Sequence, residues 1–298
     1  MKLIRHARAL GASSSGGAMV ALLGFGSLAL ASPAVGAGLA VTRETPASLP
    51  GYNVYRPANL AAARRPLPVI AWANGGCVRY DASWTTLFER WASEGYFVVT
   101  ITLPPGMTDA AKAPRSTPAD QAAAIDWAIK QNGTAGSPYR GRLDTGRIVA
   151  AGNSCGGISS LTVASKDPRV KSVFVLSGSS VGPNQTREAA QAITGKVSAP
   201  VLFVVGGKED IATPAVEMDY GLLPGGVAAM VVTRSSGDHR TVSTDPAMLA
   251  DSADISVNWF KATLYRDAAA IKALANGICS RCDPKTWSAK SKNLAAGK

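Results

Sequence analysis

The sequence predicts an α/β protein with a mainly parallel central sheet that carries helices on both faces. Short apolar runs rich in Val and Ile alternate along the chain with stretches of helical periodicity, which is typical of parallel strands joined by helices. The runs are apolar throughout, so both faces of the sheet should be covered. The 298 residues suffice for one large core, and hydrophobic residues make up 46% of them, so we expect a folded chain.

The strands are predicted from the apolar runs. Those of the parallel part are Leu67–Trp72, Tyr96–Leu103, Arg147–Gly152, Val170–Leu176, Pro200–Val205 and Val227–Thr233. Two earlier segments, Leu39–Arg43 and Tyr52–Arg56, are expected to pair as an antiparallel edge. The stretches interpreted as loops are Pro104–Ser116, Gly133–Thr145 and Ser177–Ala199.

Helical periodicity appears between these runs. One helix should end at Gly95 and has an apolar stripe at i, i+3, i+4 and i+7, formed by Trp84, Leu87, Phe88 and Trp91. The next should begin at Thr117-Pro118, because threonine caps helices and proline suits the first helical position, and should end at Asn132-Gly133. A C-terminal helix is predicted from the stripe Leu249, Ala253, Val257, Phe260 and Leu264.

Residues 1–37 have the pattern of a secretory signal peptide. A basic start precedes an apolar stretch, Ala18–Leu30, and small residues at Ala29–Ala31 or Val35–Ala37 offer cleavage sites. The alternative is a membrane anchor, but the apolar stretch is too short and too rich in Gly and Ala for a span. We therefore expect a secreted or periplasmic protein whose residues 38–298 form a single catalytic domain with a cysteine-containing C-terminal tail.

The charge of the chain does not favour nucleic-acid binding. Without the three basic residues of the leader, 28 basic and 20 acidic residues remain, a net charge of +8. They are scattered, and no basic run interleaves with aromatic residues. We expect a monomer with a solvated basic surface and no stable membrane insertion.

The segment Arg147–Gly157 contains the motif Gly152-x-Ser154-x-Gly156. It follows a predicted strand and precedes a predicted helix, Gly156–Ala164, which is the setting of a nucleophile elbow. The turn is so tight that the positions of Gly152 and Gly156 have no room for side chains. We predict Ser154 as the nucleophile; the alternative is an ordinary glycine-rich loop.

A serine hydroxyl needs a base, and His239 is the only histidine after the leader. It follows the last strong strand. Asp210 follows the preceding strand and would orient the imidazole and stabilise its charged form; Glu209 and, less favourably, Asp238 are alternatives. The order Ser154, Asp210, His239 is the order expected of a nucleophile-elbow enzyme.

Acyl transfer also requires donors for the developing oxyanion. One should be the backbone N–H of Cys155, which follows the nucleophile. The second should come from the loop Ala73–Cys77, where we favour Gly76, with Cys77 as the alternative. A plain glycine turn is the other interpretation of this loop.

With these motifs in this order, the chain resembles the α/β-hydrolase superfamily, and within it the bacterial cutinases, polyester hydrolases and dienelactone-hydrolase-like esterases. Gly206-x-x-x-Asp210-x-x-x-Pro214 resembles the acid loop of cutinases, and Trp259–Asp267 resembles their C-terminal helix. Those enzymes usually have an aromatic residue where this chain has Gly76 and often a methionine where it has Cys155. This chain also has no tryptophan after Val170–Leu176.

The resemblance implies an α/β-hydrolase fold without a large lid. The implied activity is serine-dependent hydrolysis of short- to medium-chain or polyester-like carboxylic esters, through an acyl-enzyme and without cofactor or metal. The alternatives are a secreted serine peptidase of the same fold and a catalytically inactive binding protein built on it. A thiol nucleophile at Cys155 is a further alternative, which the elbow spacing does not favour.

The four cysteines are an even number, which in an exported protein favours two disulfides. Cys279 and Cys282 have the spacing of a redox or half-zinc motif, but a local bridge suits their Gly/Pro-flanked tail better. In the fold that the resemblance implies, Cys77 and Cys155 follow neighbouring strands. A bridge between them would hold the two oxyanion donors together; buried thiols or another pairing are the alternatives.

Overall fold

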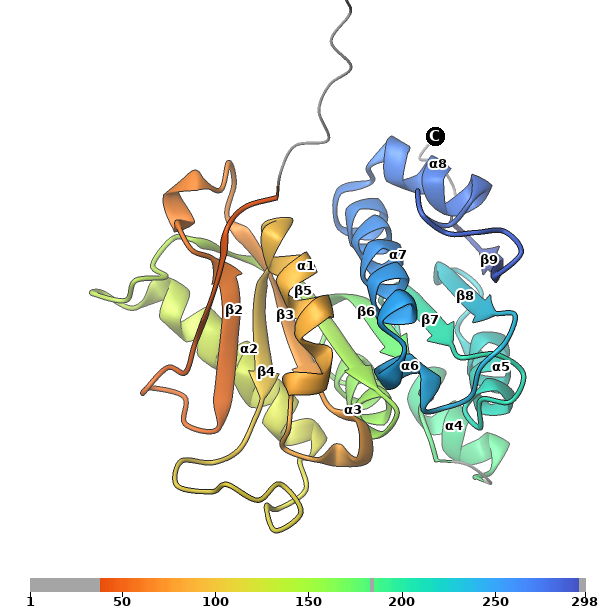
Figure 1. Ribbon diagram of the computed structural model, residues 1–298, viewed down its shortest axis with the longest axis horizontal. Coiled ribbons are helices and arrows are strands. Elements are labelled where there is room, and N and C mark those ends of the chain that lie inside the picture. The colour runs from red at the N-terminus through yellow and green to blue at the C-terminus, as the bar shows by residue number, and fades with distance from the viewer. Residues whose placement is uncertain (1–37, 183–184, 295–298) are drawn as a thin grey trace, which may run out of the picture. The chain divides into compact units, whose positions relative to one another are not determined.

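The computed structural model describes residues 38–182 and 185–294 (Figure 1). These residues form a nine-stranded mixed sheet in the order β1-β2-β4-β3-β5-β6-β7-β8-β9. The predicted α/β class is therefore confirmed. The predicted signal peptide, residues 1–37, lies outside the described residues.

The strands begin and end near the predicted positions, except that β5 begins four residues early. They are β1 (Val41–Glu44), β2 (Tyr52–Pro57), β3 (Leu67–Ala73), β4 (Phe97–Ile101), β5 (Leu143–Asn153), β6 (Val170–Leu176), β7 (Val201–Val205), β8 (Ala229–Arg234) and β9 (Trp287–Lys292). Strands β3 to β8 pair in parallel, as predicted from their continuous apolar runs. β1 and β2 form the predicted antiparallel edge, and β9 adds a second antiparallel edge beside β8.

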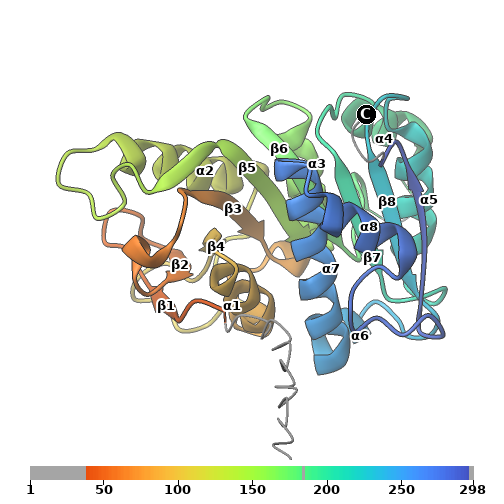
Figure 2. The same cartoon turned by 90° about the horizontal axis from the view of Figure 1, so that it is seen from above.

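Helices cover both faces of this sheet, as Figure 2 shows. One face carries α2 (Pro118–Gly133), α3 (Cys155–Ala164), α4 (Arg187–Thr194) and α5 (Thr213–Leu222). The other carries α1 (Thr85–Ser93), α7 (Pro246–Tyr265) and α8 (Ala268–Asn276). A short helix, α6 (Thr241–Thr244), precedes α7. Alternate residues of each central strand enter the two hydrophobic cores, so the sheet is buried on both sides.

The helix starts follow local capping chemistry. α2 begins directly after Thr117, whose backbone N–H donates to the Asp120 carboxylate at 2.7 Å, with Pro118 at the first helical position. α7 begins after Asp245, whose side chain accepts from the amides of Ala247 and Met248. The start of α2 is the predicted one, and α7 contains the whole of the predicted stripe from Leu249 to Leu264.

The structure corrects three predictions. The stretch Gly133–Thr145, interpreted as a loop, contains the start of β5, because Leu143 and Asp144 pair with β3 ahead of a register shift. The stretch Ser177–Ala199, interpreted as a loop, contains α4, because Thr186 caps it and Ala190 and Thr194 give it a buried side. The C-terminal tail contains α8 and β9. β9 lacks the apolar alternation of a strand: only Trp287 is buried, and Lys290 is exposed, as lysines often are on edge strands.

Among the described helices, none combines the length and the apolar character that crossing a membrane requires.

Candidate active site

Ser154 lies in the turn that joins β5 to α3. Its backbone has φ 50° and ψ −116°, a combination that non-glycine residues rarely adopt. Its N–H donates to the Leu176 carbonyl at 3.0 Å, and its own carbonyl accepts from Gly157 N–H at 2.8 Å. The strained turn is thus fixed from both sides, and Ser154 lies directly before the N-terminus of α3.

The glycines around Ser154 are required by close packing. A Cβ on Gly152 would lie 2.3 Å from the Gly156 carbonyl oxygen, and one on Gly156 would lie 2.0 Å from the Ala73 carbonyl oxygen. Neither contact can be relieved by moving a side chain, because both neighbours are backbone. The structure therefore accounts for the spacing of the Gly-x-Ser-x-Gly motif.

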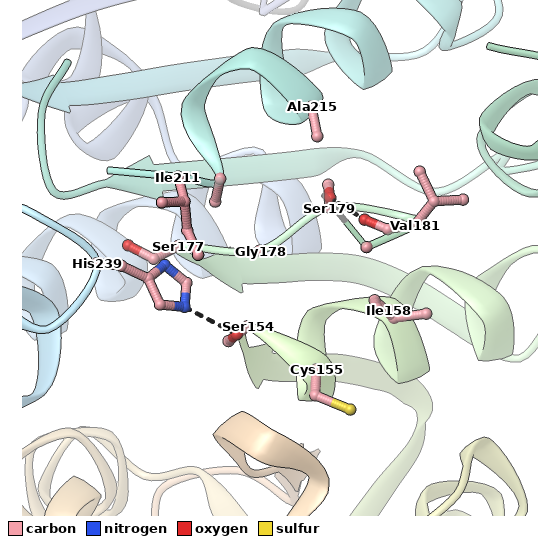
Figure 3. Close-up of a pocket in the computed structure, with 12 residues that line it drawn as sticks. Ser154, Cys155, Ile158, Ser177, Gly178, Ser179, Val181, Ile211, Ala215 and His239 are labelled. Atoms are coloured by element: carbon pink, nitrogen blue, oxygen red, sulfur yellow. Dashed lines mark hydrogen bonds between the residues drawn. The ribbon is translucent and has the colours of Figure 1, made fainter. Parts of the chain in front are cut away.

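The structure brings Ser154, His239 and Asp210 together. The Nε2 atom of His239 lies 2.9 Å from the Ser154 Oγ, and its Nδ1 lies 2.7 Å from the Asp210 Oδ1. Figure 3 shows the imidazole directed at the serine hydroxyl. The three residues follow β5, β8 and β7, so they converge at the carboxyl edge of the parallel strands.

Asp210 is buried and receives donors on both carboxylate oxygens. Ser177 Oγ donates to Oδ2 at 2.5 Å and Gly206 N–H to the same oxygen at 2.9 Å, while Ala212 N–H donates to Oδ1 at 3.0 Å. Burial by itself raises the pKa of Asp210, but the hydrogen bonds from His239, Ser177 and the two amides bring the pKa below its usual value. The carboxylate is therefore ionised and can only accept.

The charge on Asp210 determines the tautomer of the imidazole. Because an ionised carboxylate has no proton to donate, Nδ1 of a neutral His239 must carry the proton. Nε2 is then left as the acceptor of the Ser154 hydroxyl proton. This is the arrangement that general-base activation of a serine requires.

Neither alternative acid contacts the imidazole within the described residues. Glu209 is exposed beside Lys208. Asp238 caps the following turn, where its Oδ1 accepts from Arg240 and Thr241 N–H, both at 2.9 Å.

The loop predicted to supply the second oxyanion donor lies against the serine turn. It forms a short 3-10 turn, η2 (Gly75–Cys77), in which Gly76 and Cys77 both have positive φ. Arg115 Nη1 donates to the Gly76 carbonyl at 2.7 Å, and Ser116 N–H donates to the Cys77 carbonyl at 2.8 Å. The Arg115 contact orients the peptide group that carries the Cys77 N–H. The peptide group that carries the Gly76 N–H is held by its carbonyl, on Gly75, which accepts from Val78 N–H at 3.2 Å.

Both expected disulfides are present. Cys77 and Cys155 are bonded across the oxyanion loop and the start of α3, with their Cα atoms 5.3 Å apart. Cys155 therefore has no free thiol to act as a nucleophile in this structure. Cys279 and Cys282 form a local bridge, which leaves no thiolate for the zinc interpretation of that motif.

A small pocket of about 170 Å³ opens beside Ser154 and His239 (Figure 3). Its walls are mostly apolar and include Ile158, Val181, Ile211, Ala212 and Ala215. Asp219 holds one wall in place: its buried carboxylate accepts from Ser180 N–H and Oγ, both at 2.6 Å. We call this cavity the first pocket.

Ser177 and the apolar residues of the first pocket were not predicted from the sequence. Ser177 follows β6, inside the stretch interpreted as a loop, and its hydroxyl faces Asp210 only because β6 and β7 are neighbours. The usable signal was its position at the carboxyl end of a predicted strand. Ile211 was equally visible in the sequence, next to Asp210, as an apolar residue that remains 59% exposed.

Comparisons with known proteins are consistent with this geometry. A family model described as PET hydrolase-like matches residues 34–277. The bis(hydroxyethyl) terephthalate hydrolase of Streptomyces coelicolor is 27% identical over 214 residues, which cover 71% of this chain and 61% of that relative. The chain thus spans about three fifths of the length of the relative.

Proposed function

Because this chain belongs to the PET hydrolase-like family, we propose that it is a serine hydrolase of carboxylic esters with an α/β-hydrolase fold. Ser154 is the nucleophile, His239 the base and Asp210 the orienting acid. The observation that carries the proposal is the continuous hydrogen-bonded chain from Ser154 Oγ through His239 to the buried Asp210.

The proposed reaction has two steps. Ser154 Oγ attacks the ester carbonyl while His239 Nε2 accepts its proton, and the oxyanion is held by N–H groups of Cys155 and of Gly76 or Cys77. His239 then protonates the departing alcohol, which leaves an acyl group on Ser154. Water, deprotonated by His239, attacks this acyl-enzyme and releases the carboxylic acid.

The proposed substrates are short- to medium-chain esters and polyester-like esters. The first pocket, at about 170 Å³, is smaller than the cavities of 300 Å³ or more that take drug-sized ligands. Its apolar walls suit an aliphatic or aromatic acyl group. The relative hydrolyses, by its name, bis(hydroxyethyl) terephthalate, an ester with an aromatic acyl group.

We also propose that residues 1–37 direct export and that residues 38–298 work as one catalytic domain. Two disulfides support an oxidising compartment. The enzyme needs neither metal nor organic cofactor in this mechanism, and we propose that it acts as a monomer.

The triad is tested by substitution and by covalent labelling. Ser154→Ala and His239→Ala should each lower kcat for nitrophenyl esters by about 10⁴-fold or more, since each removes an essential part of one unit. Asp210→Asn should cost about as much by favouring the wrong tautomer. A fluorophosphonate probe should label the unsubstituted enzyme at Ser154 and leave Ser154→Ala unlabelled.

Two results would contradict this proposal. Retention of most esterase activity by a folded Ser154→Ala variant would exclude Ser154 as the nucleophile. Absence of both labelling and ester hydrolysis in the folded, unsubstituted protein would favour the inactive binding protein instead.

A further inference from the structure

A second pocket, of about 280 Å³, adjoins Ser154 and His239. The two pockets share these two residues and no others. The remaining residues of the second pocket come from four places: the loop Gly75–Val78, the segment that leads to α1, the residue before Ser154, and the turn and short helix α6 that follow His239. An ester whose carbonyl lies at Ser154 can therefore place one half in each pocket.

The two pockets differ in chemistry. The first pocket has no charged side chain other than His239 if that ring is protonated. The second has apolar walls as well, from Val78 and Trp84, but it adds Arg240 and the hydroxyl-bearing residues Tyr80, Ser83 and Ser243. No carboxylate lines it, so Arg240 is its one permanently charged residue.

The guanidinium of Arg240 is free to bind a ligand. Within the described residues it makes no hydrogen bond or ion pair, and only the backbone of Arg240 is engaged. The neighbouring carboxylate of Asp238 attracts Arg240 electrostatically but forms no ion pair with it, and its Oδ1 accepts from the Thr241 amide and from Thr241 Oγ1, both at 2.9 Å. A second acid close to this region, Asp81, is buried and accepts from Asn53 and Thr100.

We infer that the second pocket binds a carboxylate on the ester substrate, and that Arg240 is the residue that selects for it. Guanidinium and carboxylate pair by charge-assisted hydrogen bonds, and the hydroxyls of Ser83, Ser243 and Tyr80 add neutral donors. The preferred substrates would be esters with a free acid group, such as half-esters of dicarboxylic acids. This inference rests on the proposed esterase function.

The test uses two pairs of esters that differ only in a carboxylate. Monoethyl and diethyl adipate differ on the acyl side, and 4-carboxyphenyl and phenyl butanoate differ on the alcohol side. For each pair the ratio of kcat/KM, acid-bearing over neutral, is measured in the unsubstituted enzyme and in Arg240→Gln. Dividing one ratio by the other cancels the intrinsic reactivity of the esters.

Arg240→Gln should lower this ratio about tenfold for at least one pair, the effect of losing one charge-assisted hydrogen bond at an open site. The pair that responds identifies the half of the substrate that enters the second pocket. Arg240→Lys should retain part of the preference, because it keeps the charge and loses the planar fork. High salt should reduce the preference of the unsubstituted enzyme.

Arg140→Gln is the matched control. Arg140 is exposed in the turn before β5, at the end of that strand opposite to Ser154, so the substitution makes the same change in net charge away from the site. Its ratios should equal those of the unsubstituted enzyme.

The inference is overturned if Arg240→Gln leaves both ratios within twofold of the original, or if Arg140→Gln lowers them equally. Failure of the proposed function looks different: the neutral esters themselves would then not be hydrolysed in a Ser154-dependent way. Neutral-ester hydrolysis with an unchanged ratio therefore counts against the role of Arg240 alone.

Discussion

Asp210 shows how a single buried carboxylate can be kept charged. Its side chain is fully buried, yet each oxygen receives two donors: Ser177 and Gly206 on Oδ2, and His239 and Ala212 on Oδ1. Removing one donor leaves the cost of desolvating the carboxylate unchanged and takes away one of the hydrogen bonds that offset this cost. Ser177 is therefore a positioning residue for the triad, acting through Asp210.

Ser177→Ala should lower kcat more than it changes KM, because it removes one donor that positions the acid without touching the substrate carbonyl. Ser177 has a φ of 42°, which alanine adopts about as poorly as serine, so the comparison isolates the hydroxyl. We expect a loss of about 1.5–3 kcal/mol in the free energy of unfolding at pH 7, the range for hydrogen bonds to charged groups.

The pH dependence of this loss has a defined sign. The pKa of Asp210 is lower in the folded protein than in the unfolded chain, so its contribution to stability is present above pH ~4 and is lost as the pH falls through the folded pKa. The stability difference between Ser177→Ala and the unsubstituted protein should thus shrink at pH 3. Ser172→Ala is the control, since Ser172 is also buried on β6 but bonds to Thr263. A difference that is the same at pH 3 and pH 7 would contradict the assignment.

Among single residues, candidate catalytic residues could be predicted where a local sequence pattern points to them. The glycine spacing pointed to Ser154, and His239, the one histidine outside the predicted signal peptide, had no competitor. Ser177 and Arg240 could not be found in this way, because their roles depend on which strands and loops become neighbours. A serine after a strand is common, and only the pairing of β6 with β7 turns it toward Asp210.

At the scale of elements, the Cys77–Cys155 disulfide joins two segments that the sheet alone would only place side by side. β3 and β5 are parallel neighbours, and η2 and α3 follow them. The bridge closes 78 residues of chain, which in the chain-entropy model stabilises the fold by about 4.5 kcal/mol. It also links the two segments that we propose hold the oxyanion.

Cys77→Ala should therefore lower kcat about tenfold or more while KM rises less, since a displaced donor weakens transition-state binding selectively. The assay is run below the melting temperature of the variant, with near-UV circular dichroism to show that it is folded. Replacing Cys279 and Cys282 together by serine is the control, and this variant should keep kcat. A folded Cys77→Ala enzyme with unchanged kcat would show that the bridge serves stability only.

α4 and β9 escaped prediction because neither has a strong local sequence pattern. α4 has only eight residues and sits among Gly, Pro and Ser, so its short amphipathic pattern did not stand out from a loop. β9 carries Trp287 and then mostly Ser and Lys. Its strand form depends on the open edge of β8, which no local pattern of the tail reveals.

For the whole molecule, the strand order explains why residues distant in sequence share one site. β5, β6, β7 and β8 are consecutive neighbours in the sheet, and each is followed at its carboxyl end by one residue of the hydrogen-bonded chain: Ser154, Ser177, Asp210 and His239. The predicted parallel sheet was sufficient to place Ser154, Asp210 and His239 at one edge. It was not sufficient to define the pockets, whose walls are loops.

The C-terminal segment completes this sheet, although it lies beyond the family match, which ends at residue 277. β9 pairs with β8 from Ala229 to Arg234, and Ser235, in the loop that carries His239, donates its N–H to the Thr286 carbonyl at 2.7 Å. Trp287 is buried and donates Nε1–H to Asp251 of α7 at 2.9 Å. The segment thus connects β8, α7 and the loop of His239.

Removal of residues 278–298 should therefore destabilise the protein by at least about 3 kcal/mol, the cost of losing one buried tryptophan, and lower Tm by about 6 °C or more for a domain of this size. The bared edge of β8 should also promote aggregation. Calorimetry of the truncated and full chains measures the first effect, and light scattering the second.

The Cys279→Ser/Cys282→Ser variant is the control. It keeps β9 and loses only a four-residue covalent loop, so it should cost at most about 2 kcal/mol. If the truncated chain melts at the temperature of the full chain, β9 and Trp287 do not contribute to stability. If the serine variant melts as low as the truncated chain, the stability comes from the disulfide and not from the completed sheet.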